Sequence, residues 1–222
     1  MNWLAKYNII PNNSKLYEMA FTHKSYGVIN DLNYSYERLE FLGDSILSML
    51  VSEYLYKRYS HKGEGELTKL RANYVCEAAL IYYSKILNLD KNIHVYSDEE
   101  MKISKNEVLS INADVFESVL GAIYLDQGID KTRDFLENTI FPFIDRGIIF
   151  FNDYKSKIKE YGDANEVSVE YKLIEEFGYP HDKTFIMEII VDGKEIGKGI
   201  GKSKKEAEQL AAQKAITKLN IN

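Results

Sequence analysis

The sequence predicts a mainly α-helical domain followed by a small α+β domain with the order helix–strand–strand–strand–helix. Apolar residues recur at helical spacing through about the first 145 residues, and the later part alternates with a period of two, as strands do. Between the two parts the composition shifts at about residues 147–152, which we interpret as a linker. We therefore expect one domain over residues 1–147 and a second over 153–222.

The first long helix is expected from about Glu37 to Tyr59 and carries three carboxylates. Glu37, Glu40 and Asp44 are spaced i, i+3 and i+7, which places them within an arc of roughly 60°. Their neighbours are apolar nearly all round, which predicts a buried helix. Buried carboxylates are costly unless a counter-charge or a metal ion compensates them. An ordinary solvated helix face therefore explains this pattern poorly.

The remaining helices of the first domain follow from glycine, proline and the apolar pattern. In the second of them Asp114 and Glu117 share one face at i, i+3, and Gly128 suits a C-terminal cap. Their expected positions are a helix over 66–88 after a glycine turn at 63–65, an irregular polar stretch over 90–105, a helix over 106–126, and a helix from about 131 to about 142.

The acidic residues favour a hard divalent cation. Oxygen ligands from Asp and Glu suit Mg²⁺ or Mn²⁺ better than zinc. The four His are scattered and Cys76 stands alone, so neither a zinc site nor a disulfide framework is expected. A di-iron storage or redox bundle would need Glu-x-x-His pairs, which the sequence lacks.

The second domain is predicted from period-two runs and caps. Asp192-Gly193 is a hairpin turn signal, and Asp153 and Ser203 are suitable N-caps. The expected elements are a helix over 153–161 stopped by Gly162, strands over 167–175, 184–191 and 194–200, and a helix from Ser203 through Leu219.

Four motifs in this order resemble the bacterial ribonuclease III family. They are AFTHKSY at 20–26, ERLEFLGDS at 37–45, GEGELTKLRA at 63–72 and ADVFESVLGAIYLD at 113–126. The later helix–strand–strand–strand–helix order, with SKKEAE at 203–208, resembles the double-stranded RNA-binding domain that this family carries at its C-terminus.

The resemblance implies a divalent-metal-dependent endonuclease that hydrolyses double-stranded RNA and leaves 5′-phosphate and 3′-hydroxyl ends. It also implies processing of ribosomal RNA precursors and other structured transcripts, with no organic cofactor. Asp44 and Glu117 are then the indispensable pair. Glu37 and Glu64 either contact RNA or outer-shell water or are ordinary surface carboxylates. The implied ligands of Mg²⁺, for which Mn²⁺ can substitute, are Glu40, Asp44, Asp114 and Glu117.

Family members act as homodimers, and Phe41 resembles the residue that fills a pocket of the partner; the alternative is a plain core phenylalanine. In the second domain, lysines at a helix N-terminus suit phosphate, although a solvated helix start has the same composition. The implied RNA contacts are Ser156, Lys159, Glu160, His181, Lys202, Lys204 and Lys205.

The sequence departs from the family at three places. Residues 93–100 replace a stretch that is usually glycine-rich, Lys159 stands where Gln is frequent, and no proline precedes Tyr171. These departures concern loops and RNA contacts, not the acidic residues. The run from Gly197 to Ser203 resembles a P-loop only superficially, because Ile196 stands where that motif needs its first glycine.

Composition narrows the remaining alternatives. The net charge is −6, so RNA binding must come from local clusters of cations and not from bulk attraction. We expect no run to approach a membrane span, and the single cysteine favours a reducing cytoplasm. A non-catalytic RNA-binding protein of the same fold stays possible, but such a protein should have lost at least one of the four carboxylates.

Overall fold

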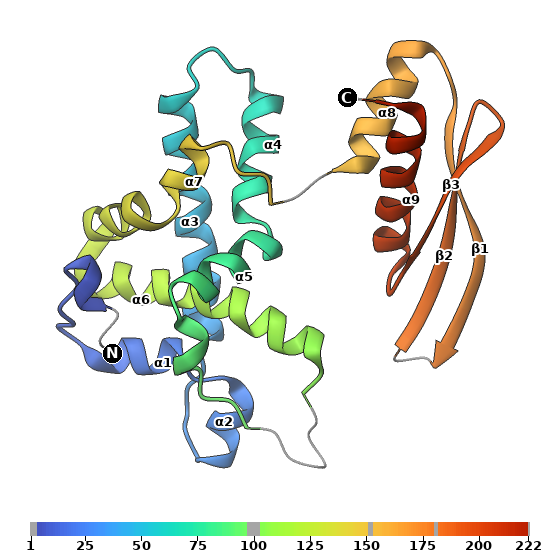
Figure 1. Ribbon diagram of the computed structural model, residues 1–222. Coiled ribbons are helices and arrows are strands. Elements are labelled where there is room, and N and C mark those ends of the chain that lie inside the picture. Colours follow the sequence, from blue (N-terminus) through green and yellow to red (C-terminus); the bar gives the residue numbers. More distant parts are fainter. Residues whose placement is uncertain (1–3, 97–102, 151–152, 180–181, 222) are drawn as a thin grey trace. The chain divides into compact units, whose positions relative to one another are not determined.

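The computed structural model describes residues 4–96, 103–150, 153–179 and 182–221 (Figure 1). Within these ranges the chain forms two compact units that divide between Phe151 and Asn152. We call them the helical unit and the sheet unit and describe each by itself.

The helical unit is built from helices, as predicted. Its only described β-type pairing is an isolated bridge between Thr22 and His94. In chain order the elements are η1 (Leu4–Tyr7), α1 (Ser14–Ala20), α2 (Lys24–Ile29), α3 (Glu37–Arg58), α4 (Glu64–Val75), α5 (Glu77–Ile86), η2 (Leu89–Asn92), α6 (Lys105–Thr139) and α7 (Phe141–Asp145).

Helix α3 has one buried face and one exposed face, so the prediction of burial on all sides was wrong. Leu47, Leu50 and Val51 are almost completely buried. Phe41 and Met49, in contrast, are 78% and 51% exposed. The helix packs chiefly against α6 and α4, and nothing in the described part of the chain covers the apolar residues on its other side.

The helix predicted over residues 66–88 is in fact two helices. α4 ends at Val75 and α5 begins at Glu77, with Cys76 between them in an extended conformation (φ −73°, ψ 156°). α4 packs against α3, whereas α5 packs against α6. The break at Cys76 therefore lets consecutive helical segments serve two different neighbours.

Helix α6 contains the predicted interruption at Gly128, whose φ of 82° is left-handed. We did not expect any segment of membrane-span length, but Glu107–Thr139 is long and apolar enough by length and composition. Of its most apolar stretch, 61% is buried inside the protein, which is typical of the central helix of a globular core.

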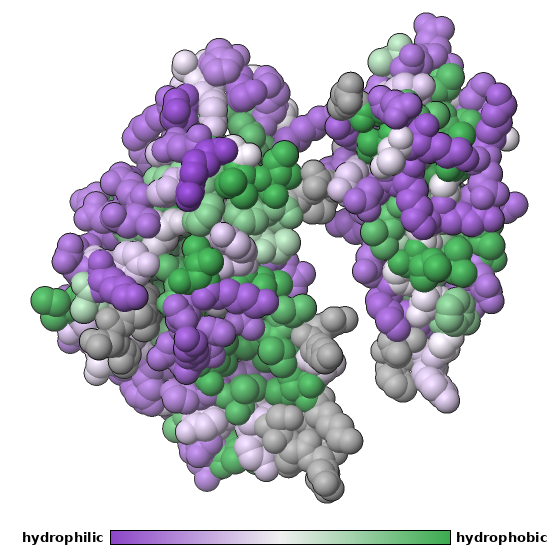
Figure 2. Space-filling model, in the orientation of Figure 1, coloured by the Kyte–Doolittle hydropathy of each residue, from purple (hydrophilic) through white to green (hydrophobic). Residues whose placement is uncertain are grey.

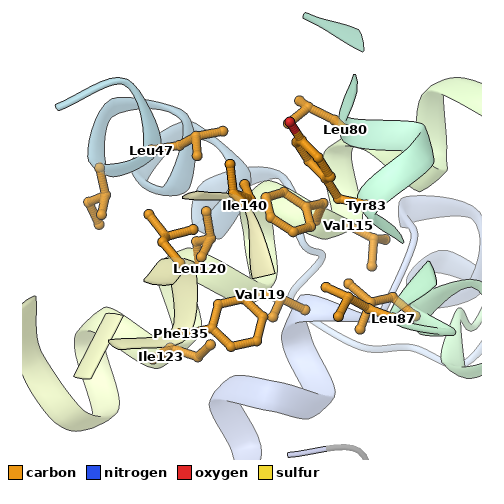
Figure 3. Close-up of a cluster of buried hydrophobic side chains, with 14 of the residues drawn as sticks. Leu47, Leu80, Tyr83, Leu87, Val115, Val119, Leu120, Ile123, Phe135 and Ile140 are labelled. Atoms are coloured by element: carbon orange, nitrogen blue, oxygen red, sulfur yellow. The ribbon is translucent and has the colours of Figure 1, made fainter. Parts of the chain in front are cut away.

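The core of the helical unit gathers around α6. Side chains from α3 and α5, together with Ile140 just after α6, pack against the buried side chains of α6 (Figure 3). Burying this much apolar surface is the main favourable contribution to the folding of such a unit. Residues in this cluster include Leu47, Leu80, Tyr83, Leu87, Val115, Val119, Leu120, Ile123, Phe135 and Ile140.

The sheet unit has the predicted order of elements. Its strands form one antiparallel sheet in the order β1-β2-β3, and Asp192 and Gly193 make the turn between the last two strands with positive φ. The elements are α8 (Tyr154–Asn165), β1 (Val169–Tyr179), β2 (Asp182–Val191), β3 (Lys194–Gly201) and α9 (Lys204–Leu219).

Two boundaries in the sheet unit differ most from the prediction. α8 does not stop at Gly162 but continues to Asn165, after which Glu166 takes a left-handed conformation (φ 55°). Gly162 lies against β1, where an added Cβ would come within 2.7 Å of Val169 Cγ2. β1 itself extends to Tyr179, because its pairing with β2 resumes after an irregularity between Leu173 and Glu175.

Helix α9 lies very close to β3. A Cβ at Gly199 would stand 1.9 Å from the carbonyl oxygen of Ala207. Alanines on the inner face of α9, including Ala211 and Ala215, are fully buried against the sheet. Small residues on both partners thus allow the helix and the strand to approach closely, which fixes where α9 begins.

Candidate metal centre and RNA-contacting surface

The candidate centre lies where α3 crosses α6 (Figure 1). Two glycines permit an unusually close crossing. A Cβ at Gly43 would stand 1.8 Å from the backbone oxygen of Glu117, and one at Gly121 would stand 2.4 Å from that of Leu39. Because Gly43 lies beside Asp44, this crossing brings the acidic face of α3 to the acidic residues of α6.

The negative charges of four carboxylates act on one another at this crossing. Burial raises the pKa of Glu117 to about 8, and the negative charges of Asp44 and Glu40 add to the rise. Burial also raises the pKa of Glu40 to about 7, with further contributions from Asp114 and Glu37. These mutual effects show that the side chains lie close enough to repel one another.

Asp114 is held by a partner that sequence reasoning missed. The hydroxyl of Tyr36 donates to Asp114 Oδ2 over 2.9 Å. Burial raises the pKa of Asp114, and the Tyr36 hydrogen bond opposes that rise. Tyr36 stands just before the acidic helix, but no sequence rule indicates that its side chain reaches residue 114. The crossing glycines, Gly43 and Gly121, were missed for the same reason.

The donor set fits a hard divalent cation in its chemistry. It consists of carboxylate oxygens from two adjacent helices, with no thiol or imidazole among them. No three Asp, Glu, His or Cys side chains of the described residues are already gathered around one cation position. The residues that would hold a cation are Glu40, Asp44, Asp114 and Glu117.

The two outer carboxylates have different surroundings. Glu37 is exposed at the start of α3, where it pairs with Lys24 over 3.7 Å and accepts from the Ser35 hydroxyl. It also adds to the rise in the pKa of Glu40, so it lies beside the cluster. Glu64 is the first residue of α4 and accepts from the hydroxyl of Thr68 over 3.0 Å.

The exposed side of α3 carries Phe41. With 78% of its surface accessible, this side chain is not part of the core of the helical unit, so the core alternative is wrong. An exposed phenylalanine next to the acidic cluster loses contact with water only if another molecule covers it.

The first candidate RNA contacts lie on α8. Ser156 belongs to the helix cap: its backbone N–H donates to Asp153 Oδ1 over 3.1 Å, and its hydroxyl donates to the same carboxylate. Lys159 and Glu160 are exposed on the following turn. Hydrophilic side chains cover much of the sheet unit on the face shown in Figure 2.

The second group of candidate contacts surrounds the start of α9. Ser203 and Glu206 both contribute to the cap of α9: Ser203 Oγ accepts from Glu206 N–H (3.1 Å), and Glu206 Oε2 accepts from Lys202 N–H (2.6 Å). This cap fixes the backbone that presents Lys204 and Lys205, which are both exposed. The predicted contact His181 lies outside the described residues.

Comparisons with known proteins divide the chain in the same way. Residues 13–144 match a family model described as ribonuclease-III-like. Residues 154–219 match the model of the double-stranded RNA binding motif.

Individual relatives agree with the family models. The chain is 44% identical to ribonuclease 3 of Geobacillus sp. (strain WCH70) over 220 residues, covering 96% of this chain and 88% of that protein. It is 43% identical to ribonuclease 3 of Listeria monocytogenes over 213 residues, covering 93% and 92%. Among solved structures, the nuclease domain of ribonuclease III from Campylobacter jejuni matches with a TM-score of 0.55 and 33% identity, covering 62% of this chain and 93% of that one.

Proposed function

This chain belongs to the ribonuclease III family, and from that premise we propose how it works as an endonuclease of double-stranded RNA. The helical unit hydrolyses phosphodiester bonds in the RNA, and the sheet unit supplies affinity for the duplex. The observation that carries this proposal is the glycine-mediated crossing of α3 and α6, at which the charges of three other carboxylates act on Glu117.

We assign the cation to Glu40, Asp44, Asp114 and Glu117. Ribonucleases of this family depend on divalent metal, and a set of carboxylate oxygens favours Mg²⁺, with Mn²⁺ as a substitute. When bound, such a cation lowers the pKa of a water molecule and offsets the charge that develops on the departing 3′-oxygen. The products of this reaction are 5′-phosphate and 3′-hydroxyl ends.

The protein residues have separate tasks in this proposal. Asp44 and Glu117 are the two carboxylates without which cleavage stops, and the charge of Asp44 acts on Glu117 across the helix crossing. Glu37 and Glu64 act further out, at the RNA or at outer-shell water. Partial burial of Glu117 and Asp114 strengthens electrostatic interactions at these two carboxylates, whereas Asp44 is exposed to solvent.

We further propose that the enzyme acts as a homodimer in the cytoplasm. The exposed Phe41 on α3 would insert into a pocket of the partner, which removes the solvent exposure of this ring. The Campylobacter jejuni nuclease domain is described as structurally flexible in a region involved in dimer formation. Two copies would supply one carboxylate cluster for each RNA strand, which suits processing of ribosomal RNA precursors and other structured transcripts.

The sheet unit binds the duplex mainly through phosphate. Lys202, Lys204 and Lys205 surround the N-terminus of α9, where the helix dipole and free backbone N–H groups favour anions. Ser156, Lys159 and Glu160 on α8, together with His181, contact the minor groove and its 2′-hydroxyls. Such contacts recognise the shape of double-stranded RNA and read little sequence.

Incubation with a perfect RNA duplex tests the function directly. With Mg²⁺ or Mn²⁺ we expect duplex cleavage, and with EDTA we expect binding without cleavage. A single-stranded RNA of the same sequence is the matched control and should stay intact. Undiminished cutting in excess chelator, with no metal carried over, would show that the assigned mechanism is wrong. A correctly folded protein that binds duplex RNA but never cuts it would favour the non-catalytic alternative.

A further inference from the structure

Tyr36 links the two helices of the carboxylate cluster. Its carbonyl oxygen accepts from the backbone N–H of Glu40 over 2.9 Å, so it forms the first turn of α3. Its hydroxyl donates to Asp114 Oδ2 on α6, also over 2.9 Å. One residue therefore contacts two of the assigned cation ligands, one through its backbone and one through its side chain.

The side chain of Tyr36 has little freedom to move. Only 3% of the residue is exposed, and its ring lies 5.7 Å from the ring of His23, centroid to centroid. His23 is itself buried and is bonded to Ser25. The backbone N–H of Tyr36 donates to Thr22 O over 2.9 Å. The hydroxyl is thus held in place from both the ring and the backbone.

The hydrogen bond constrains the Asp114 carboxylate. One oxygen, Oδ2, accepts from Tyr36, which favours Oδ1 as the oxygen that would bind a cation. Because one oxygen of the Asp114 carboxylate is held by a fixed donor, the position of its other oxygen is restricted as well. Groups that orient a metal ligand in this way commonly change metal affinity or activity by about 10–100-fold when they are removed.

We propose that Tyr36 is a positioning residue for the cation: its hydroxyl holds Asp114 in the orientation in which the second carboxylate oxygen faces the cluster. This inference rests on the function proposed above, because it takes Asp114 as a ligand. Tyr36 contacts neither RNA nor cation in this role and acts through Asp114.

The chain contains a matched control for this contact. Tyr17 is completely buried, and its hydroxyl donates to Asp126 Oδ2 over 3.0 Å. Asp126 lies on α6, like Asp114, but its carboxylate also accepts from the backbone N–H groups of Asn12 and Asn13. Tyr17→Phe therefore removes the same kind of hydrogen bond from the same helix without touching the carboxylate cluster.

The experiment compares Tyr36→Phe and Tyr17→Phe with the wild-type protein. Mn²⁺ affinity is measured by electron paramagnetic resonance, and duplex cleavage is measured across a Mg²⁺ titration. For Tyr36→Phe we expect Mn²⁺ affinity to fall about tenfold and the half-saturating Mg²⁺ concentration to rise by a similar factor. The maximal rate at saturating Mg²⁺ and the affinity for duplex RNA in EDTA should stay close to wild type. Tyr17→Phe should lower only the melting temperature.

Two results would overturn the role of Tyr36. One is an unchanged Mn²⁺ affinity in Tyr36→Phe, and the other is an equal loss of affinity in both tyrosine variants, which would indicate general destabilisation. If Tyr36→Phe is less stable, Mn²⁺ affinity is measured for all three proteins well below the melting temperature of that variant, where a loss confined to Tyr36→Phe supports the role and an unchanged affinity overturns it. A wild-type protein that is inert with every divalent cation contradicts the proposed function itself, whatever the variants do.

Discussion

The helical unit and the sheet unit place their functional residues in opposite environments. In the helical unit the candidate ligands Asp114 and Glu117 are half-buried at a helix crossing, and burial raises the pKa of both. In the sheet unit, Lys204 and Lys205 are exposed on a helix whose other face packs on the sheet. In the proposed function, cleavage would thus depend in part on carboxylates that the core constrains, whereas affinity would depend on lysines that the core only presents.

Both units use glycine to bring elements together, but with different consequences. At Gly43 the close approach of α3 and α6 positions the functional carboxylates themselves. At Gly199 the close approach of β3 and α9 fixes only the start of the helix that carries the lysines. A substitution that blocks the close approach should therefore abolish cleavage when it is made at Gly43. At Gly199 it should only shift the lysines at the start of α9.

The largest expected effect comes from charge removal in the helical unit. Glu117→Gln and Asp44→Asn keep the side-chain volume but remove a negative charge that the cation requires. We expect the cleavage rate to fall by about a thousandfold, equivalent to about 4 kcal/mol of activation free energy, with duplex affinity close to wild type. Glu137→Gln, an exposed change on the same helix α6, is the control and should cut normally. Equal losses of affinity and rate would contradict the division of tasks between the units.

The next effect tests the helix crossing. Gly43→Ala would place a Cβ 1.8 Å from Glu117 O, which forces α3 and α6 apart. We expect the helical unit to lose about 3 kcal/mol of unfolding free energy, the upper end for overpacking, while the sheet unit melts unchanged. In Gly65→Ala nothing lies within 4 Å of the new Cβ, so its stability should be equal or slightly higher. If calorimetry showed the same melting temperature for both variants, the close crossing at Gly43 would not be needed for the stability of the helical unit.

The sheet unit should respond through salt dependence. Lys204→Ala with Lys205→Ala removes two cations from the start of α9, where the helix dipole favours phosphate. Affinity should fall about equally for unrelated duplexes, and the plot of log K against log[salt] should become shallower by up to about one unit per lost contact. Lys214→Ala with Lys218→Ala changes two exposed lysines further along the same helix and serves as the control. An unchanged salt slope in the first variant would rule out phosphate contacts there.

Local sequence patterns predicted the elements well where the periodicity and caps were strong. The helix bearing Glu40 and Asp44, the hairpin turn at Asp192-Gly193 and the Ser203 cap all occur as expected. The break at Cys76 was missed because no glycine or proline marks it, and the residues on both sides favour helix. Tertiary packing against two different neighbours overrode that local preference.

The sequence allows a candidate site to be proposed as a list of residues, but not as an arrangement. Spacing places Glu40 with Asp44, and Asp114 with Glu117, on common faces. It cannot show that Gly43 meets the backbone of Glu117, because a helix crossing depends on residues far apart in the chain. The contact from Tyr36 to Asp114 spans 78 positions and is invisible for the same reason.

The smallest expected effect is a pH dependence of stability in the metal-free protein. Burial, helped by neighbouring carboxylates, raises the pKa of Glu117 to about 8 and that of Glu40 to about 7, from 4.5. A carboxyl group with a raised pKa binds its proton more tightly when folded, so its stabilising contribution is complete below about pH 4.5 and is lost as the pH rises through the folded pKa. His23, whose pKa is lowered by burial, destabilises the fold only below about pH 6.5. Between about pH 6.5 and 8.5 the melting temperature in EDTA should therefore fall by a few degrees.

Two comparisons sharpen this last prediction. Mg²⁺ should flatten the fall, because a bound cation favours the ionised carboxylates in the folded state. Glu117→Gln should flatten it in EDTA as well, because the variant has no proton to lose at that position. The exposed lysines of the sheet unit stay charged over this pH range, so they should add no such dependence of the melting temperature on pH. A wild-type melting temperature that rises with pH in EDTA, or a slope that Glu117→Gln leaves unchanged, would mean that the buried carboxylates do not control the stability of the helical unit.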